Sequence, residues 1–207
     1  MREQAGDTDV MTQANNLLIL GRVLIKLSDH VGAKDNLNRA LALYGQLGTT
    51  RGQAHCYSLL SMVCMASSQL QDAKDCLDKA KALYATSGTT PSTGYARALL
   101  LVARQYAQSN NPSFDVAKDL LHRALAVCRE HSELGGMYEA YVDLGELHCR
   151  LSEWDEAEKH FLSALELATE QSWERRCKRV SELLRDVYTN SNQPENAAKY
   201  ATQAEDA

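Results

Sequence analysis

The chain has 207 residues, of which 44% are hydrophobic and 24% are charged, and its formal net charge is −5. Only three residues are proline, and this composition favours helices over strands. The acidic balance lies in residues 104–207, which carry 12 basic and 19 acidic side chains. Because phosphate binding needs a basic surface, the charge argues against nucleic acid as the main partner.

The N-terminal sequence MREQAGDTDV lacks the apolar core of a signal peptide. Residues 52–71 contain no Asp, Glu, Lys or Arg, but they are too polar to span a bilayer. The six cysteines include no C-x-x-C pair, so we expect them to act as small packing residues. These features predict a soluble cytoplasmic protein without a membrane partner, with the nucleus as an alternative location.

A pattern of about twelve residues recurs along the chain. AKDNLNRALALY begins at Ala33, AKDCLDKAKALY at Ala73, AKDLLHRALAVC at Ala117 and AEKHFLSALELA at Ala157. A degenerate fifth copy begins at Ala197, and the starts are 40, 44, 40 and 40 residues apart. Apolar residues within each copy have helical spacing. A fixed period of this size is typical of a solenoid.

Each copy predicts the second helix of a pair, because another apolar helical segment precedes it. Ser152 with Asp155, and Asn192 with Glu195, have the spacing of a capping box at the start of a second helix. The sequence predicts a lead-in at residues 1–13 and one array over residues 14–205. The repeats are expected at about residues 14–52, 53–94, 95–136, 137–176 and 177–207.

Helical repeats of this length could be of armadillo or HEAT type, but the residue pattern favours another family. The fourth copy reads YVDLGELH over residues 141–148 and AEKHF over residues 157–161. It resembles the tetratricopeptide repeat (TPR), whose signature is W-x-x-L-G-x-x-Y followed by A-x-x-x-F. The period near 40 resembles the longer repeats of kinesin light chains and spindle-orientation adaptors. The resemblance implies an all-α fold, a right-handed superhelical solenoid of five antiparallel helix pairs.

Small residues recur where the two helices of a pair are expected to cross. Gly21, Ser61, Ala103 and Gly145 hold this position in the first four copies. Small side chains there allow close approach, and larger residues fill the grooves on either side. The fifth copy has Arg185 instead, so we expect a different packing there, such as that of a terminal cap.

In the TPR family the first helix of each pair lines the concave face, where a groove holds an extended peptide or a helix of a partner. The resemblance therefore implies a candidate lining drawn from the first helices. Its residues are Asn15, Arg22, Lys26, His55, Met62, Met65, Arg97, Arg104, Gln108, Glu139, Glu146 and Arg150, with Arg179, Asp186 and Asn190 in the fifth copy.

Two parts of this lining have a chemical character of their own. Arg22, Arg97 and Arg104, together with Lys26, would suit an acidic peptide, since Arg pairs with carboxylates through two hydrogen bonds. Ordinary solvated charges are the alternative interpretation. The methionines at 62 and 65 suit an adaptable protein-binding surface, and interior packing is the alternative.

The first helix raises a separate question, because little of its surface is polar. Leu18, Ile19 and Ile25 form a candidate apolar interface that needs cover. Residues 1–12, a second copy of the chain in a homodimer, or an upstream repeat of a larger protein could each provide it.

No catalytic or metal-binding constellation is evident. His148, Cys149 and His160 invite a search for a metal site, but adjacent helical residues point about 100° apart and converge poorly on one ion. The sequence has no Gly-rich phosphate loop and no catalytic motif, so we expect no cofactor and no catalytic residue. The sequence predicts a non-enzymatic scaffold or adaptor that binds a protein or peptide. A structural or dimerisation segment of a large assembly, or a regulatory domain of a larger enzyme, is the alternative.

Overall fold

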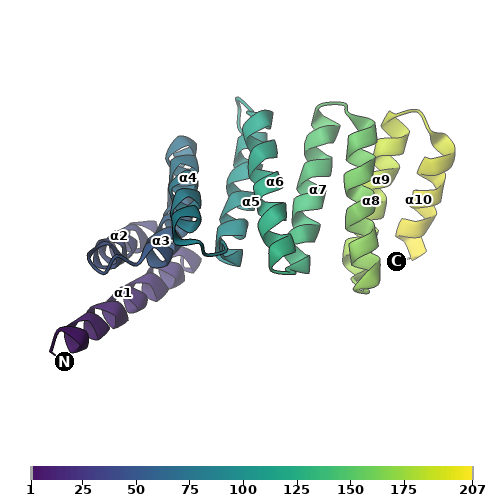
Figure 1. Ribbon diagram of the computed structural model, residues 1–207. Helices are drawn as coiled ribbons and strands as arrows, with labels where there is room; N and C mark the ends of the chain where they lie inside the picture. The colour runs from purple at the N-terminus through teal and green to yellow at the C-terminus, as the bar shows by residue number, and fades with distance from the viewer. Residues whose placement is uncertain (1, 207) are drawn as a thin grey trace. The chain divides into compact units, whose positions relative to one another are not determined.

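The computed structural model describes residues 2–206, and over these residues it contains ten α-helices and no strand (Figure 1). This confirms the predicted all-α fold. The helices are α1 (Arg2–Lys26), α2 (His30–Gln46), α3 (Thr50–Ala66), α4 (Leu70–Ser87), α5 (Thr93–Gln108), α6 (Phe114–Glu130), α7 (Leu134–Arg150), α8 (Trp154–Glu170), α9 (Glu174–Asn190) and α10 (Pro194–Asp206).

The helices group into two compact units, Met1–Gln108 and Ser109–Ala207. In the first unit α1 packs against α2 and α3 against α4, and α5 packs against both α3 and α4. In the second unit α6 packs against α7, while α7 with α8 and α9 with α10 form pairs. Helices α6 to α10 follow one another side by side in chain order (Figure 1). The boundary between the units falls between α5 and α6, so the single array over residues 14–205 stays a prediction.

Helix α1 is longer than expected, because it begins at Arg2 and includes the predicted lead-in. Residues 2–13 are mostly polar and have no apolar stripe, which is why helical periodicity does not detect them. They also contain no proline, so nothing in the backbone prevents the helix from extending through them. Residues 2–12 therefore continue the axis of α1 and do not fold back over its apolar side chains.

The turns between helices have a common backbone geometry. Over residues 2–206, eight of the nine turns contain one residue with a positive φ between 51° and 64°, a left-handed conformation that ends the preceding helix, and the turn between α5 and α6 contains none. The predicted capping boxes are wrong for this reason: Ser152 closes α7, and Glu153 precedes α8 without a side-chain cap. Asn192 has the same left-handed geometry before α10. The left-handed residues are Ser28, Gly48, Ser68, Gly88, Ser132, Ser152, Ser172 and Asn192.

The small crossing positions are the places where paired helices come closest. A Cβ atom at Gly21 would lie 2.7 Å from Leu37 Cγ, and one at Gly145 would lie 2.6 Å from Phe161 Cδ1. Ser61 is fully buried at the equivalent position of the second pair. Glycine and serine are therefore required by close packing against the second helix, as the sequence predicts.

The fifth pair solves the same crossing differently. Arg185 is only partly buried, and its guanidinium donates to Asp186 Oδ1 at 2.7 and 2.9 Å. Position 201 of α10, which corresponds to Leu37 and Phe161, is alanine. The large side chain has moved to the first helix and the small one to the second, so the two helices still pack.

Candidate functional site

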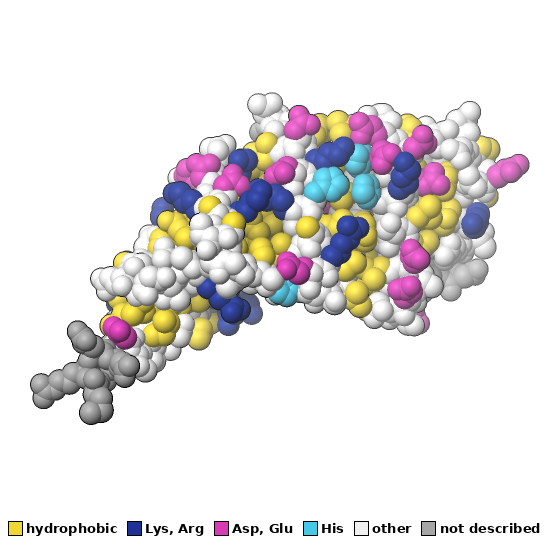
Figure 2. Space-filling view, in the orientation of Figure 1, with side chains coloured by type: hydrophobic (Ala, Val, Ile, Leu, Met, Phe, Trp, Pro, Cys, Tyr) yellow, Lys and Arg dark blue, Asp and Glu magenta, His cyan; other side chains and the backbone are white. Residues whose placement is uncertain are grey.

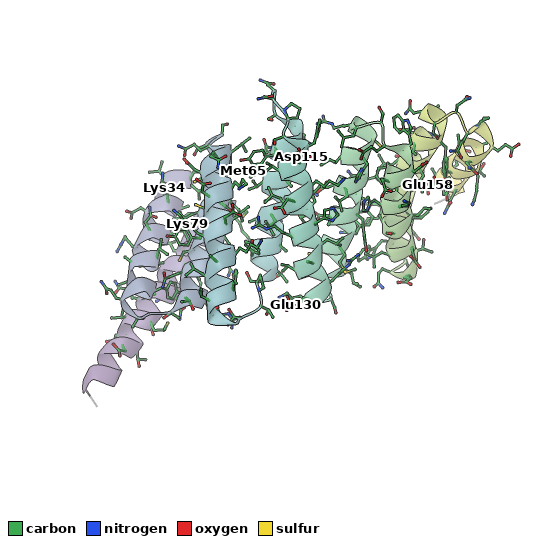
Figure 3. The ribbon with its side chains drawn as sticks, turned by 45° about the horizontal axis from the view of Figure 1, so that its top comes forward. Lys34, Met65, Lys79, Asp115, Glu130 and Glu158 are labelled. Carbon is green, nitrogen blue, oxygen red and sulfur yellow. The ribbon has the colours of Figure 1, made fainter. Side chains whose placement is uncertain are left out.

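The first helices of the first unit carry charge of one sign. From residue 10 of α1 through α3 and α5, these helices contain five basic side chains and no Asp or Glu. We call this surface the basic face. Second helices of the same unit carry both signs, with Lys34 on α2 and Lys79 on α4 labelled in Figure 3. The basic face consists of Arg22, Lys26, Arg51, Arg97 and Arg104.

His55 lies among the charges of this face. Burial, followed by the nearby Arg51 and Arg22, lowers the pKa of its imidazole below the ordinary value. The ring packs 6.1 Å from the ring of Tyr84. Its Nε2 atom is buried and has no hydrogen-bond partner among the described residues. His55 is therefore a neutral imidazole that lies beside two guanidinium groups, with its Nε2 inside the packing of the unit.

The other predicted residues of α1 and α3 take different places. Met62 and Met65 are half-buried, with Met65 close to the C-terminal end of α3 (Figure 3). Asn15 Oδ1 accepts a hydrogen bond of 2.7 Å from the hydroxyl of Tyr44 on α2. Asn15 is thus committed to holding α1 against α2, while the methionines leave part of their surface exposed.

Helix α5 contributes the remaining residues of the basic face. Arg97 and Gln108 are exposed, and Arg104 is half-buried. Arg51, at the start of α3, is also exposed. The sequence interpretation missed Arg51 because that position is not part of the lining implied by the TPR resemblance, although its charge and its place before His55 were visible signals.

The first helices of the second unit have a different character. Glu146 of α7 forms an ion pair with Arg179 of α9, with 3.1 Å between Oε1 and Nη2. Glu139 is half-buried, and Arg150 is exposed. Both signs of charge are present, and ion pairs inside the unit already join some of them. The predicted lining therefore separates into a basic face on one unit and a mixed surface on the other.

Three histidines gather in the second unit, on α6, α7 and α8. The ring of buried His148 stacks on that of His160 with 5.3 Å between centroids, and His148 Nδ1 lies 2.5 Å from Glu153 Oε2. Burial, then the neighbouring His148 and His122, lower the pKa of His160 to about 4. A group of histidine side chains is visible on the surface in Figure 2.

These histidines do not form a metal centre. Within residues 2–206, no three His, Cys, Asp or Glu side chains are arranged to hold a metal ion. The stacked rings of His148 and His160 place their nitrogens side by side, whereas a metal needs ligands that converge on it. The cluster is best described as packing between α7 and α8.

The cysteines are free thiols, three of them buried and three half-buried. Burial raises the pKa of Cys56 to about 12 and that of Cys149 to about 11. The thiolate is the reactive form of cysteine, so these groups are poor nucleophiles near neutral pH. Their environment is that of packing residues.

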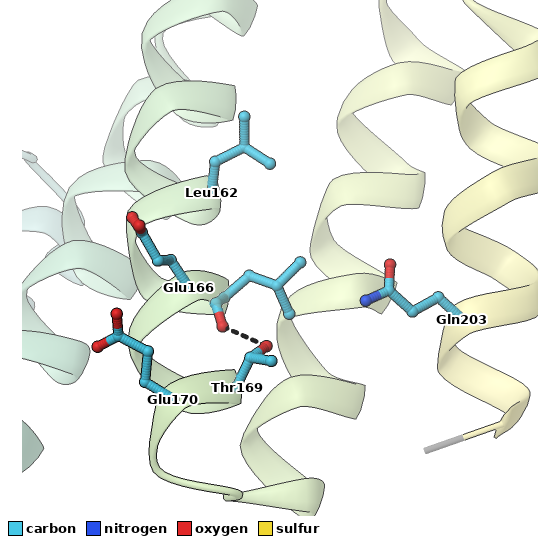
Figure 4. Close-up of a pocket in the computed structure, with 6 residues that line it drawn as sticks. Leu162, Glu166, Thr169, Glu170 and Gln203 are labelled. Carbon is cyan, nitrogen blue, oxygen red and sulfur yellow. Dashed lines mark hydrogen bonds between the residues drawn. The ribbon is translucent and has the colours of Figure 1, made fainter.

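A shallow groove of about 510 Å³ lies between α8 and α10 (Figure 4). Leu162 and Leu165 provide its apolar floor, and Glu166 and Glu170 stand on its rim. Thr169 does not point a free hydroxyl into it, because Oγ1 donates to Leu165 O at 2.8 Å. The groove is open and acidic, and no sequence pattern predicted it.

No helix in the described part of the chain combines the length and the apolar character needed to cross a bilayer. Comparison by sequence gives no match, either to a protein-family model or to a curated protein.

Comparison by structure gives clear matches to helical-repeat proteins. The crystal structure of BtubC (BKLC) from P. vanneervenii has a TM-score of 0.75 at 18% identity, covering 99% of this chain and 89% of that chain. Nearly identical TPR-like repeats from Podosopora anserina, named for a kinesin light chain, give a TM-score of 0.68 at 16% identity, covering 94% of both chains. A Rap protein complexed with competence and sporulation factor gives 0.65 at 15% identity, covering 95% of this chain and 64% of that chain. These likenesses show a TPR-like fold.

Proposed function

We propose that this chain, a TPR-like repeat protein by its fold, is a non-enzymatic scaffold that binds an acidic segment of another protein on the basic face of residues 1–108. The segment lies across α1, α3 and α5, and its carboxylates pair with the guanidinium groups of Arg22 and Arg97. The methionines of α3 provide an adaptable apolar contact at the centre of the face.

The segregation of charge in the first unit carries this proposal. Five basic side chains stand on three first helices that have no carboxylate from residue 10 onward, so the charge along these helices has one sign. Charge complementarity of this kind steers association and selects the partner more than it adds affinity.

The comparisons lend support at the level of fold. One solved structure with the same fold is a Rap protein complexed with competence and sporulation factor. The thiols of buried Cys56 and half-buried Cys149 are poor nucleophiles, which fits a binding protein better than an enzyme.

A binding assay with two peptide pools tests the proposal. Both pools contain random twelve-residue peptides with three fixed positions, which are Asp or Glu in one pool and Asn or Gln in the other. We expect the acidic pool to bind with a Kd on the order of micromolar and to weaken as salt increases. The Arg22→Glu/Arg97→Glu variant should lose at least tenfold in affinity.

The matched control makes the same change of charge in the second unit. Arg175 and Lys178 are exposed on α9, and the Arg175→Glu/Lys178→Glu variant should bind as the unchanged protein does. An equal loss of affinity in both variants would mean that binding depends on the net charge of the protein and not on the basic face. Equal binding of the acidic and amide pools would refute the proposal.

A second candidate function is favoured by a different observation. Ile19, Val23 and Leu27 of α1 are exposed, as a structural or dimerisation segment of a large assembly would require. Light scattering over a range of concentrations separates this candidate from a monomeric adaptor. A dimer that Ile19→Glu dissociates would favour self-assembly, and a monomer at all concentrations would count against it.

A further inference from the structure

Helix α1 presents an exposed stripe of apolar side chains outside the basic face. Ile19, Leu20, Val23 and Leu27 recur at intervals of three to four residues, and each is at least 43% exposed. Val31 at the start of α2 is exposed as well. We call the four residues of α1 the α1 stripe. Leu18 and Ile25, which the sequence also singled out, are half-buried against the clusters that join α1 to its neighbours.

The equivalent positions in the next repeat show which kind of helix packs against such a stripe. Leu20 and Val23 correspond to Leu60 and Val63 of α3, which are only 6% and 2% exposed. Leu60 and Val63 share a buried cluster with Ala33 and Leu37 of the preceding second helix, α2. A second helix packed on α3 therefore covers the positions that remain open on α1.

The fifth pair shows the same relation. Leu184 and Val187 of α9 occupy the positions of Leu20 and Val23, and they are buried in one cluster with Phe161 and Leu165 of α8. The covering helix carries its apolar residues four apart and has an alanine beside them, at Ala164 and Ala168. In α3 and α9 alike, the cover comes from the helix before.

Charge defines one edge of the stripe. Arg22 follows Ile19 by three residues and Lys26 follows Val23 by three, so both basic side chains border the stripe on the same side. Both are exposed. The equivalent positions of α9 hold Asp186 and Asn190, so α9 has no basic edge of this kind. A helix that docks here gains from carboxylates along the adjoining edge.

We propose that the α1 stripe docks an amphipathic helix of a partner protein that has the character of a second helix of this repeat. Its apolar face carries a leucine or phenylalanine four residues from an alanine, and its edge beside Arg22 and Lys26 is acidic. Helix α8 shows that a covering helix can carry a carboxylate against the first helix, since Glu158 Oε1 accepts a hydrogen bond of 2.7 Å from Tyr188 of α9 (Glu158 is labelled in Figure 3). This site goes beyond the proposed function, because its docking surface is the apolar stripe, which shares only the bordering Arg22 and Lys26 with the basic face.

A second copy of the chain is the less suitable occupant. Helix α10 is the last second helix of the chain, and its positions 201 and 205 are Ala and Glu where α8 has Phe161 and Leu165. It offers a small and polar surface that would leave the stripe unfilled. In an antiparallel pairing of two α1 helices, the basic edges of both copies would lie on the same side and repel one another.

The sequence of α8 provides a probe for the experiment. A synthetic peptide of residues 154–170 contains the apolar face and five acidic residues. Asp155 and Lys159 are exposed and four residues apart, so a lactam between their side chains holds the peptide helical without touching that face. A fluorescent label at its N terminus allows binding to the full chain to be followed by polarisation.

We expect the peptide to bind the unchanged chain and to lose at least tenfold in affinity with Val23→Glu or Leu20→Glu. Arg22→Glu should weaken binding about threefold to tenfold. Leu151→Glu, which changes another exposed leucine outside the stripe, should have no effect. A peptide with Phe161→Ala and Leu165→Glu, which imitates α10, should not bind. Circular dichroism checks that each variant is folded.

Two results would overturn the proposal. One is binding that Val23→Glu leaves unchanged, which would mean that the peptide exchanges with α8 inside the second unit. The other is a dimer of the unchanged chain, detected by light scattering, that Val23→Glu converts to a monomer. In that case a second copy is the occupant of the stripe. Failure of the acidic peptide pool to bind the basic face would leave this proposal standing, because the α8 peptide with Leu20→Glu and Val23→Glu tests the stripe by itself.

Discussion

Helices α1 and α9 hold apolar residues at the same positions of the repeat, but these residues are exposed on α1 and buried on α9. Leu20 and Val23 of α1 are 45% and 43% exposed, whereas Leu184 and Val187 of α9 are 0% and 2% exposed. Both helices also pack against a following second helix, α2 or α10. The difference comes from the preceding second helix, which α9 has in α8 and α1 lacks within the described residues.

The same apolar residues of the repeat are therefore buried within the fold in α9 and left exposed in α1. A fully buried leucine contributes about 1.5–3 kcal/mol to folding through removal of its surface from water. In α9 that contribution stabilises the second unit. In α1 most of it is still to be gained, so it is available as binding free energy. In the second unit Glu146 pairs with Arg179 and His148 stacks on His160, each between different helices, while the charged side chains on the first helices of the first unit are all basic from residue 10 of α1 onward.

The largest expected effect comes from shortening the leucine side chain at one position of the repeat, which is Leu184 on α9 and Leu20 on α1. Leu184→Ala should lower the free energy of unfolding by about 2–5 kcal/mol, because it leaves a cavity between α8 and α9. Leu20→Ala should lower it by less than about 1 kcal/mol, since that side chain is already half in water. Urea denaturation of the two variants gives both values. Equal losses would mean that α1 is covered in solution.

A smaller effect is expected where helices cross. Gly145→Ala should lower the free energy of unfolding by about 1–3 kcal/mol, because the new Cβ would press on the ring of Phe161. Phe161→Leu in the same chain should recover part of this loss. Gly45 of α2 has no atom within 4 Å of a built Cβ, so Gly45→Ala should stabilise the helix by about 0.5–1 kcal/mol. Thermal unfolding of the three variants measures these changes. If Gly145→Ala left the stability of the chain unchanged, the packing argument would be contradicted.

Most of the fold was predictable because the repeat states it several times. The alanines at 33, 73, 117 and 157 all lie fully buried on second helices, and glycine stands at the crossing positions 21 and 145 where the structure requires it. The capping boxes failed because Ser152 has two possible uses, as a cap or as a left-handed turn residue, and its backbone conformation depends on the end of α7. Spacing alone does not distinguish them.

The candidate site was less predictable, because exposure depends on neighbours that no local pattern reveals. Asn15 was expected to face a partner, yet Tyr44, 29 residues away, binds its side chain. Ile19 was predicted to belong to an apolar interface that needs cover, and it is 50% exposed, but Leu20, Val23 and Leu27 were not singled out, since the same positions are buried or polar in the later repeats. Glu146 and Arg179 came from separate copies of the repeat, and only the fold brings them together.

The histidine cluster makes the second unit sensitive to pH. Burial, then His148 and His122, lower the pKa of His160 from its ordinary value of 6.5 to about 4, against an opposing contribution from Glu156 and with a small further lowering from Lys118. Between these values the unfolded chain binds a proton that the folded chain does not, so stability falls as the pH falls from about 6.5 to about 4. After allowance for the half-exposed ring, the loss should be roughly 1 kcal/mol.

Urea denaturation at several pH values between 7 and 4 checks this expectation. His160→Gln should flatten the dependence, because glutamine does not titrate. His131→Gln, a change to an exposed histidine at the end of α6, should leave the slope as it is. The explanation fails if the unchanged chain and His160→Gln lose the same stability over this range.

The smallest expected effect concerns the charges that distinguish the two units. A double-mutant cycle of Glu146→Ala and Arg179→Ala should give a coupling of about 0.2–1 kcal/mol in favour of the pair, because both side chains are about half exposed and water screens them. The coupling should shrink when salt rises from 0.05 to about 0.5 M, as the Debye length shortens. Arg22→Ala serves as the counterpart in the first unit and should change stability by less than about 0.5 kcal/mol. If Arg22→Ala instead cost as much as Arg179→Ala, contacts inside the first unit would hold the side chain of Arg22, and its proposed role in binding a partner would fail.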